Sequence, residues 1–357
     1  MNDASAIGIL TEAVSINASD IFLVPGSSFA HKINGRMHIN DDVKLMPATV
    51  TRIVREIYEL AESRTMDRVL DCGDDDFSFS VIGLARFRVN VFKQRGTLAA
   101  VIRVVTFDLP EYKELNISET VMGISKLKKG LALVTGPAGS GKSTTLACII
   151  DQINQTRNAH IITLEDPIEY LHRHKSSIVT QREIATDTES YVTALRAALR
   201  QVPDVILLGE LRDYETMRIA MTAAETGHLV ISTLHTVGAA NTIDRIVDMF
   251  PSSQQQQIRS QLSMVLQVVV SQQLLPALDG SAIPAYEIMF LNYAIRNMIR
   301  ESRIHQIDSV IYSSQSEGMV TMDVSLLKLV KEGKISRENA LQFSSNREAL
   351  EKKMGWG

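Results

Sequence analysis

The spacing of apolar and polar residues changes about a hundred residues into the chain. Over 77–105, apolar and polar residues alternate, which predicts strands with one buried and one exposed face. In the stretch 84–92, Arg86, Arg88 and Asn90 would share the exposed face. From about residue 118 onward, short apolar runs alternate with helical periodicity, which favours a mostly parallel sheet covered by helices.

Two domains are therefore expected. The first covers residues 1–105, a polar linker marked by Pro110 covers 106–117, and an α/β domain with C-terminal helices covers 118–357. In the second domain, the capping-box pattern Thr186–Glu189 predicts a helix that extends to Arg200. A further helix is expected over 213–226.

The composition narrows the class of protein. Of 357 residues, 45% are hydrophobic and 22% are charged, as in ordinary globular proteins, and the net charge of −4 disfavours nucleic-acid binding. The longest apolar stretch, 262–275, contains Gln267 and Gln272, so no transmembrane segment is expected. Two cysteines exclude a disulfide framework, and Cys148 is expected to be a buried thiol; a reducing cytoplasm fits this pattern.

Residues 136–143, Gly-Pro-Ala-Gly-Ser-Gly-Lys-Ser, match the phosphate-binding pattern GxxxxGK[ST]. An apolar run precedes the glycines and a helical pattern follows them, so strand, loop and helix come in the required order. Lys142 would reach the terminal phosphates of ATP, and the Ser143 hydroxyl would bind Mg²⁺. The expected nucleotide-binding residues are Gly136, Pro137, Ala138, Gly139, Ser140, Gly141, Lys142, Ser143 and Thr144.

Acids follow two of the predicted strands, where ligands of such sheets bind. One strand ends in Glu165-Asp166-Pro-Ile-Glu169, and another ends in Gly209-Glu210, which is suited to Mg²⁺ or its water shell. The acidic run 74–76 is interpreted as a solvated turn.

Basic side chains supply further candidates. His228 and His235 border a third predicted strand, and neither is expected to bind metal. Arg86, Arg88 and Arg103 form either a hydrated sheet face or arginine fingers that reach a nucleotide, their own or that of a neighbouring chain.

Together these motifs resemble those of the retraction ATPases of type IV pili, within the secretion ATPase superfamily. The resemblance extends from Ala18–Ile21 to Ile335–Asn339 and includes the phosphate loop, the two acidic strand ends and the segment 227–236. The segment Ala294–Glu301, AIRNMIRE, is similar to the AIRNLIRE motif of retraction motors, with Met298 in place of leucine. Phe22 and Ala138 depart from the residues that are common in the family.

The resemblance implies a PAS-like α+β domain followed by a RecA-like P-loop ATPase domain. It also implies a homohexamer that powers pilus retraction and twitching motility with ATP and Mg²⁺, together with an inner-membrane platform protein, at the cytoplasmic face of the inner membrane. Glu169 would act as base or orient water with Glu165 nearby, Glu210 would act through Mg²⁺, and His228 and His235 would sense the nucleotide.

Three alternatives remain at this point. A pilus-extension or type II secretion ATPase would often carry paired CxxC motifs, but this chain has two isolated cysteines. A nucleotide-responsive ring without hydrolysis would not need Lys142, Glu169 and Glu210 together. A nucleic-acid translocase would need a basic surface that the net charge disfavours.

Overall fold

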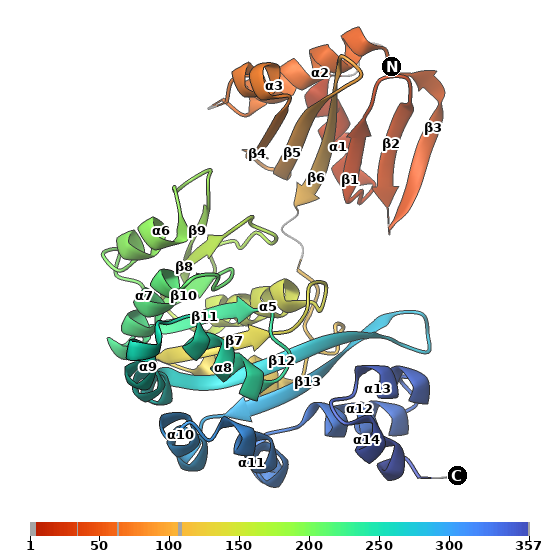
Figure 1. Ribbon diagram of the computed structural model, residues 1–357. Coiled ribbons are helices and arrows are strands. Elements are labelled where there is room, and N and C mark those ends of the chain that lie inside the picture. Colours follow the sequence, from red (N-terminus) through yellow and green to blue (C-terminus); the bar gives the residue numbers. More distant parts are fainter. Residues whose placement is uncertain (1–4, 34, 63, 106–108, 356–357) are drawn as a thin grey trace. The chain divides into compact units, whose positions relative to one another are not determined.

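The computed structural model describes residues 5–33, 35–62, 64–105 and 109–355, with no account of the side chains of 40–43. The chain divides into two compact units (Figure 1): Met1–Asp108 with Glu169–Leu171, and Leu109–Ile168 with His172–Gly357. Of the expected linker, residues 106–108 lie outside the described residues. Leu109, Tyr112 and Leu115 pack against an apolar core of the C-terminal unit.

The N-terminal unit contains a six-stranded antiparallel sheet in the order β3-β2-β1-β6-β5-β4. Its helices share one apolar core with the sheet. The elements are α1 (Ala6–Ser15), β1 (Asp20–Leu23), β2 (Ser28–Ile33), β3 (Arg36–Lys44), α2 (Pro47–Leu60), α3 (Asp67–Cys72), β4 (Asp74–Val81), β5 (Ala85–Gln94) and β6 (Thr97–Val105).

Alternation along β5 separates a buried from a polar face, which confirms the prediction for this strand. Phe87 and Val89 are fully buried in the core, whereas Arg88 is exposed and Arg86 half-buried on the opposite face. Strand pairing sets Arg88 opposite Arg103 of β6. The sheet therefore groups the predicted arginines on its polar face.

The acidic run 74–76 is not a solvated turn, and that interpretation is wrong. β4 begins at Asp74, and the Asp75 side chain is completely buried. The Asp75 carboxylate accepts a hydrogen bond from the Tyr58 hydroxyl at 2.9 Å and pairs with Arg64 at 3.0 Å. A carboxylate can be buried here because these partners replace its hydration.

The C-terminal unit is a mixed α/β fold on a seven-stranded sheet, in the order β13-β12-β7-β11-β10-β8-β9. Neighbouring strands are parallel except β12 and β13, which confirms the expected mostly parallel sheet. The strands are β7 (Gly130–Thr135), β8 (His160–Glu165), β9 (Ile178–Glu183), β10 (Val205–Leu208), β11 (Leu229–Leu234), β12 (Leu266–Pro276) and β13 (Ala282–Phe290).

Helices cover both faces of this sheet (Figure 1). One face packs against α6 (Tyr191–Ala198), α7 (Tyr214–Glu225), α8 (Ala239–Asp248), α9 (Ser252–Val265), α10 (Tyr293–Arg300) and α11 (Ile307–Ser313). The other packs against α4 (Glu119–Met122) and α5 (Lys142–Thr156). A separate small core joins the β12–β13 pair to α12 (Met322–Lys331), α13 (Arg337–Phe343) and α14 (Arg347–Lys353). Within the described ranges, no helix has the length and apolar content to cross a bilayer.

The start of α6 differs from the prediction. Residues 185–187 form a turn, in which the Asp187 carboxylate accepts from the Glu183 backbone N–H at 2.7 Å, and Thr188 forms a bridge with Ile184. The helix instead begins at Tyr191, with Ser190 as its N-cap. Helix α7 begins after Asp213, as predicted, with that carboxylate as the cap.

Candidate active site

The predicted phosphate loop lies between β7 and α5, which begins within it at Lys142. Gly136, Gly139 and Gly141 have φ values of 143°, 77° and 83°, in the region that favours glycine. A Cβ atom on Gly136 would lie 2.1 Å from the backbone oxygen of Gln272, so no other residue fits there. The loop therefore has the backbone conformation of a phosphate cradle.

The beginning of α5 supplies positive charge to this loop. The helix has 15 residues, and its N-cap, Gly141, has no side chain to cap the first turn, so backbone N–H groups there can bind phosphate oxygens. The buried Lys142 ammonium donates to the carbonyls of Gly136 at 2.8 Å and Pro137 at 2.9 Å. Ser143 is exposed on the same turn, where its hydroxyl can bind Mg²⁺ beside a phosphate. These residues fit a nucleotide with its magnesium ion.

Polar residues follow the neighbouring strands at the same edge of the sheet. Since β8, β10 and β11 run parallel to β7, their carboxyl ends lie at the edge where the phosphate loop begins. Glu165 ends β8 and accepts from Thr163 at 2.6 Å. Glu210 follows β10, and His235 follows β11 with its Nε2 atom 3.4 Å from the Glu210 carboxylate. The structure thus brings Glu165, Glu210 and His235 to the edge that carries the loop.

Arg212, which the sequence reasoning missed, pairs with Glu210 and lies 3.7 Å from the Asp166 carboxylate. Burial would raise the pKa of Glu210, but the hydrogen bond and charge of Arg212, followed by His235, outweigh burial and hold this pKa below its usual value. Glu210 is therefore ionised at neutral pH, as a ligand of Mg²⁺ or its water must be.

The fit to magnesium depends on the nucleotide as well as on the protein. In the described part of the chain, no group of three or more histidine, cysteine, aspartate or glutamate side chains could hold a metal ion. Magnesium sites of phosphate-transfer proteins commonly use one or two protein ligands and complete their shell with phosphate and water oxygens. Ser143 and Glu210 match that pattern.

The segment after β8 carries the predicted catalytic acid. Ile168 is buried, and its backbone N–H donates to the Glu183 carboxylate at 3.1 Å. Glu183 is itself buried at the end of β9, a position that the sequence reasoning did not single out. The next residue, Glu169, is exposed. A buried acid therefore fixes the backbone directly before Glu169.

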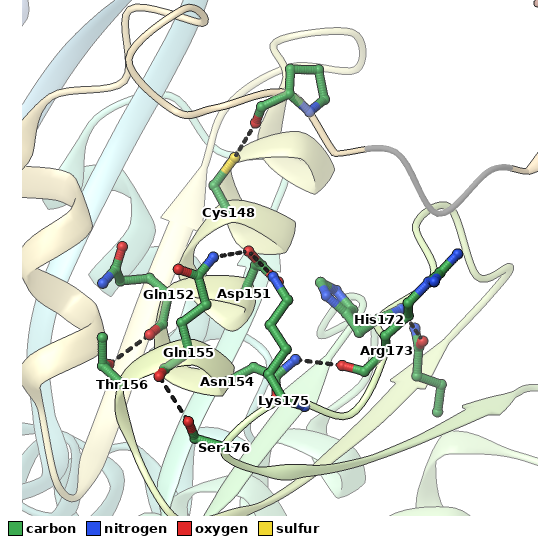
Figure 2. Close-up of polar contacts among 12 residues, drawn as sticks. Cys148, Asp151, Gln152, Asn154, Gln155, Thr156, His172, Arg173, Lys175 and Ser176 are labelled. Carbon is green, nitrogen blue, oxygen red and sulfur yellow. Dashed lines mark hydrogen bonds and ion pairs between the residues drawn. The ribbon is translucent and has the colours of Figure 1, made fainter.

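Further along, the same segment is tied to the helix that begins at the phosphate loop (Figure 2). The fully buried Asn154 of α5 donates to the backbone oxygen of Arg173 at 2.7 Å and accepts from the Lys175 N–H at 3.1 Å. Lys175 also pairs with Asp151 at 2.8 Å. Burial lowers the pKa of His172 to about 4, so this imidazole is neutral. These contacts hold residues 173–175 against α5.

His228 is not brought to this group. It precedes β11 at the amino edge of the sheet, and its ring Nδ1 lies 3.0 Å from the Ala223 carbonyl. The six residues of β11, about 20 Å of extended chain, separate it from His235. Within this chain His228 therefore lies away from the phosphate loop, and its sensing role stays a prediction.

The predicted arginines lie in the N-terminal unit. Arg88 and Arg103 line a hollow of about 260 Å³ together with Asp20, whose carboxylate accepts from Arg103 Nε at 2.9 Å. Arg86 lies 3.4 Å from the Ser80 hydroxyl. These contacts suit a polar sheet face, and the action of the arginines on a nucleotide stays a prediction.

Comparison with known proteins places the chain in a family. The family model described as Type II/IV secretion system protein matches residues 5–342. The Pseudomonas aeruginosa protein named Type IV pilus retractation ATPase PilT is 45% identical over 93% of this chain and 96% of its own length. A Neisseria gonorrhoeae protein named Twitching motility protein is 50% identical over 77% of this chain and 74% of its own length.

The solved structures agree with these relatives. The crystal structure of the pilus retraction motor PilT with bound ADP matches with a TM-score of 0.90 and 46% identity, over 98% of this chain and 100% of that one. By contrast, the type II secretion system protein E of Xanthomonas campestris is 34% identical over 68% of this chain and 43% of its own length. The chain therefore belongs to the type II/IV secretion system protein family and, within it, to the group of the pilus retraction ATPases.

Proposed function

We propose that this chain hydrolyses ATP in a Mg²⁺-dependent reaction and that the energy drives type IV pilus retraction and twitching motility. The observation that carries the proposal is the carboxyl edge of the C-terminal sheet, where Lys142, Glu165, Glu210 and His235 lie together. The assignment to pilus retraction is supported by the family to which the chain belongs.

Each residue of this edge has a distinct part in the proposed reaction. The loop amides and the Lys142 ammonium hold the phosphates and balance their charge. Ser143 and Glu210 would hold the magnesium ion, which neutralises charge on the phosphates when bound. Glu169, with Glu165, orients the attacking water and accepts its proton. His235 contacts Glu210 and can report on the state of that carboxylate.

The proposal extends to the assembly. We infer a homohexamer of chains with a PAS-like and a RecA-like domain, which acts at the cytoplasmic face of the inner membrane with a platform protein and the pilus machinery. Arg86, Arg88 and Arg103 would stabilise charge on a nucleotide, with Arg88 tested by mixing Arg88→Ala and Glu169→Gln chains. Activity in the mixture that neither variant shows alone would support sharing between chains, and no recovery would contradict it.

Phosphate release from ATP by the purified protein tests the chemistry. Wild type should release phosphate only with Mg²⁺, whereas Lys142→Ala and Glu169→Gln should each lose at least about 100-fold in kcat. Lys129→Ala is a matched control, because Lys129 is exposed immediately before β7. Hydrolysis retained in both site variants would refute the assignment, and a wild type that binds ATP without turnover would favour a nucleotide-responsive ring.

Deletion in the host tests the direction of the motor. Loss of a retraction ATPase should leave surface pili in place or increase them while twitching stops. Disappearance of pili would instead indicate an extension ATPase, and unchanged pili with defective protein secretion would indicate a type II secretion ATPase.

A further inference from the structure

A buried glutamine from a distant strand contacts the phosphate loop. Gln272 of β12 is only 2% exposed and lies beside the loop because β12 pairs with β7, with Ser271 opposite Thr135. The residues that come next are Gln272, still on β12, and Gly136, the first residue after β7. The Gln272 side chain thus lies at the base of the loop.

Both ends of the Gln272 amide are hydrogen bonded to the phosphate-binding element. Its Nε2 donates to the backbone oxygen of Ser140 at 2.7 Å. Its Oε1 accepts from the Thr145 hydroxyl, in the first turn of α5, at 2.8 Å. One side chain therefore connects the loop to the helix that follows it. An apolar residue of the same size would leave the Ser140 carbonyl and the Thr145 hydroxyl without this partner.

The bond to Ser140 has a consequence for the loop amides. In a trans peptide the C=O and the following N–H point in opposite directions. With the Ser140 oxygen held on Gln272, the N–H of Gly141 is turned away from Gln272. Turning loop amides toward one side is what a phosphate cradle requires.

We propose that Gln272 is a positioning residue that sets the phosphate loop for nucleotide binding through Ser140 and Thr145. The proposal rests on the proposed ATPase function, since it concerns the same phosphate site. Gln272 holds the Ser140–Gly141 peptide and the first turn of α5 in one fixed arrangement, so the amides need no reordering when phosphate binds.

Calorimetric titration of the purified full chain with ADP and Mg²⁺ tests this role. Gln272→Met should raise the Kd for ADP about 10-fold, the effect of losing about two buried hydrogen bonds. Gln273→Met is the matched control, because Gln273 is the next residue of β12 and donates instead to the Phe343 carbonyl of α13. The control should bind ADP within about twofold of wild type.

A second variant separates positioning from mere packing. In Gln272→Glu, an ionised carboxylate accepts from Thr145 but cannot donate to Ser140, whereas a protonated one does both. The Kd of this variant should therefore recover toward the wild-type value as pH falls from 8 to 5.5, beyond any change in wild type. If Gln272→Met does not fold, Thr145→Val should still weaken ADP binding about threefold.

Three results would overturn the inference: a folded Gln272→Met that binds ADP as tightly as wild type, an equal loss in Gln273→Met, or no recovery of Gln272→Glu at low pH. A wild-type chain that neither binds ADP nor releases phosphate would refute the proposed function instead. The two failures are therefore distinguishable.

Discussion

The two edges of the C-terminal sheet carry similar residues in different settings. At the amino edge, backbone groups take up most of the polar contacts. The His160 ring nitrogens lie 2.9 Å from the Gln201 carbonyl and 3.0 Å from the Thr180 hydroxyl. The backbone N–H of His160 donates to the Asp204 carboxylate at 2.8 Å. These contacts hold neighbouring chain segments together and leave little for a ligand.

At the carboxyl edge, side chains contact one another instead. Glu210 meets Arg212 and His235, and the charges of these partners keep it ionised despite its burial. Asp204 precedes β10 and Glu210 follows it, so one short strand carries an acid at each end. The contacts of an acid on this strand therefore depend on the end at which it lies, rather than on its residue type.

The largest effect should come from exchanging the acids of β10. We expect Glu210→Gln to lower kcat for ATP hydrolysis at least about 100-fold, because the amide cannot replace the negative charge beside Mg²⁺. Asp204→Asn, the corresponding change at the amino edge, should have a kcat within about twofold of wild type. Steady-state phosphate release measures both, and comparable losses in the two variants would erase the distinction between the edges.

Histidines allow the same comparison with a smaller effect. His235→Gln should lower kcat about 10-fold, the usual size for removing a group that orients a ligand rather than binding substrate. His160→Gln at the amino edge should leave kcat nearly unchanged and lower only the melting temperature. A larger catalytic loss in His160→Gln than in His235→Gln would contradict the assignment.

The electrostatics at the carboxyl edge predict a pH dependence. Because Glu210 has a lowered pKa in the folded chain, its pairing stabilises the fold above the ordinary value of 4.5, and this contribution is lost as pH falls through the folded pKa. Because the Arg212 side chain is 62% exposed and solvent screens its charge, Arg212→Gln should cost at most about 1 kcal/mol of unfolding free energy at pH 7 and progressively less below pH 4.5. Urea titrations at several pH values measure this difference.

The exposed pair Arg196 and Glu215, 2.6 Å apart, provides the control. Arg196→Gln should change the unfolding free energy by a few tenths of a kcal/mol and show little dependence on pH. A pH profile of Arg212→Gln that is as flat as that of Arg196→Gln would mean that Glu210 does not depend on its partner.

At the amino edge we expect a small effect on stability and none on hydrolysis. Asp204→Ala removes the acceptor of the His160 N–H, and because Asp204 is exposed the cost should be about 1 kcal/mol or less. That corresponds to a melting temperature about 2 °C lower, with hydrolysis unchanged. A loss of hydrolysis without a change in melting temperature would mean that the amino edge also takes part in the reaction.

Local patterns were sufficient for part of this description. The glycine loop, the alternation in β5 and the helix expected over 213–226 depend on residues close in sequence, and the structure has each of them there. The prediction for the start of α6 was wrong because the residues after β9 form a turn held by Asp187, and Ser190 caps the helix instead. The burial of Asp75 was not predicted because its partners, Tyr58 and Arg64, come from earlier parts of the chain.

Short-range spacing was enough to predict the phosphate loop, the alternation of strands and helices after residue 118 and the family resemblance. Only the folded chain shows that Gln272 contacts Ser140 across 132 positions and that His235 of the β11 end meets Glu210 of the β10 end. The physical reason is that strand order and direction bring together side chains whose separation along the chain carries no information about distance.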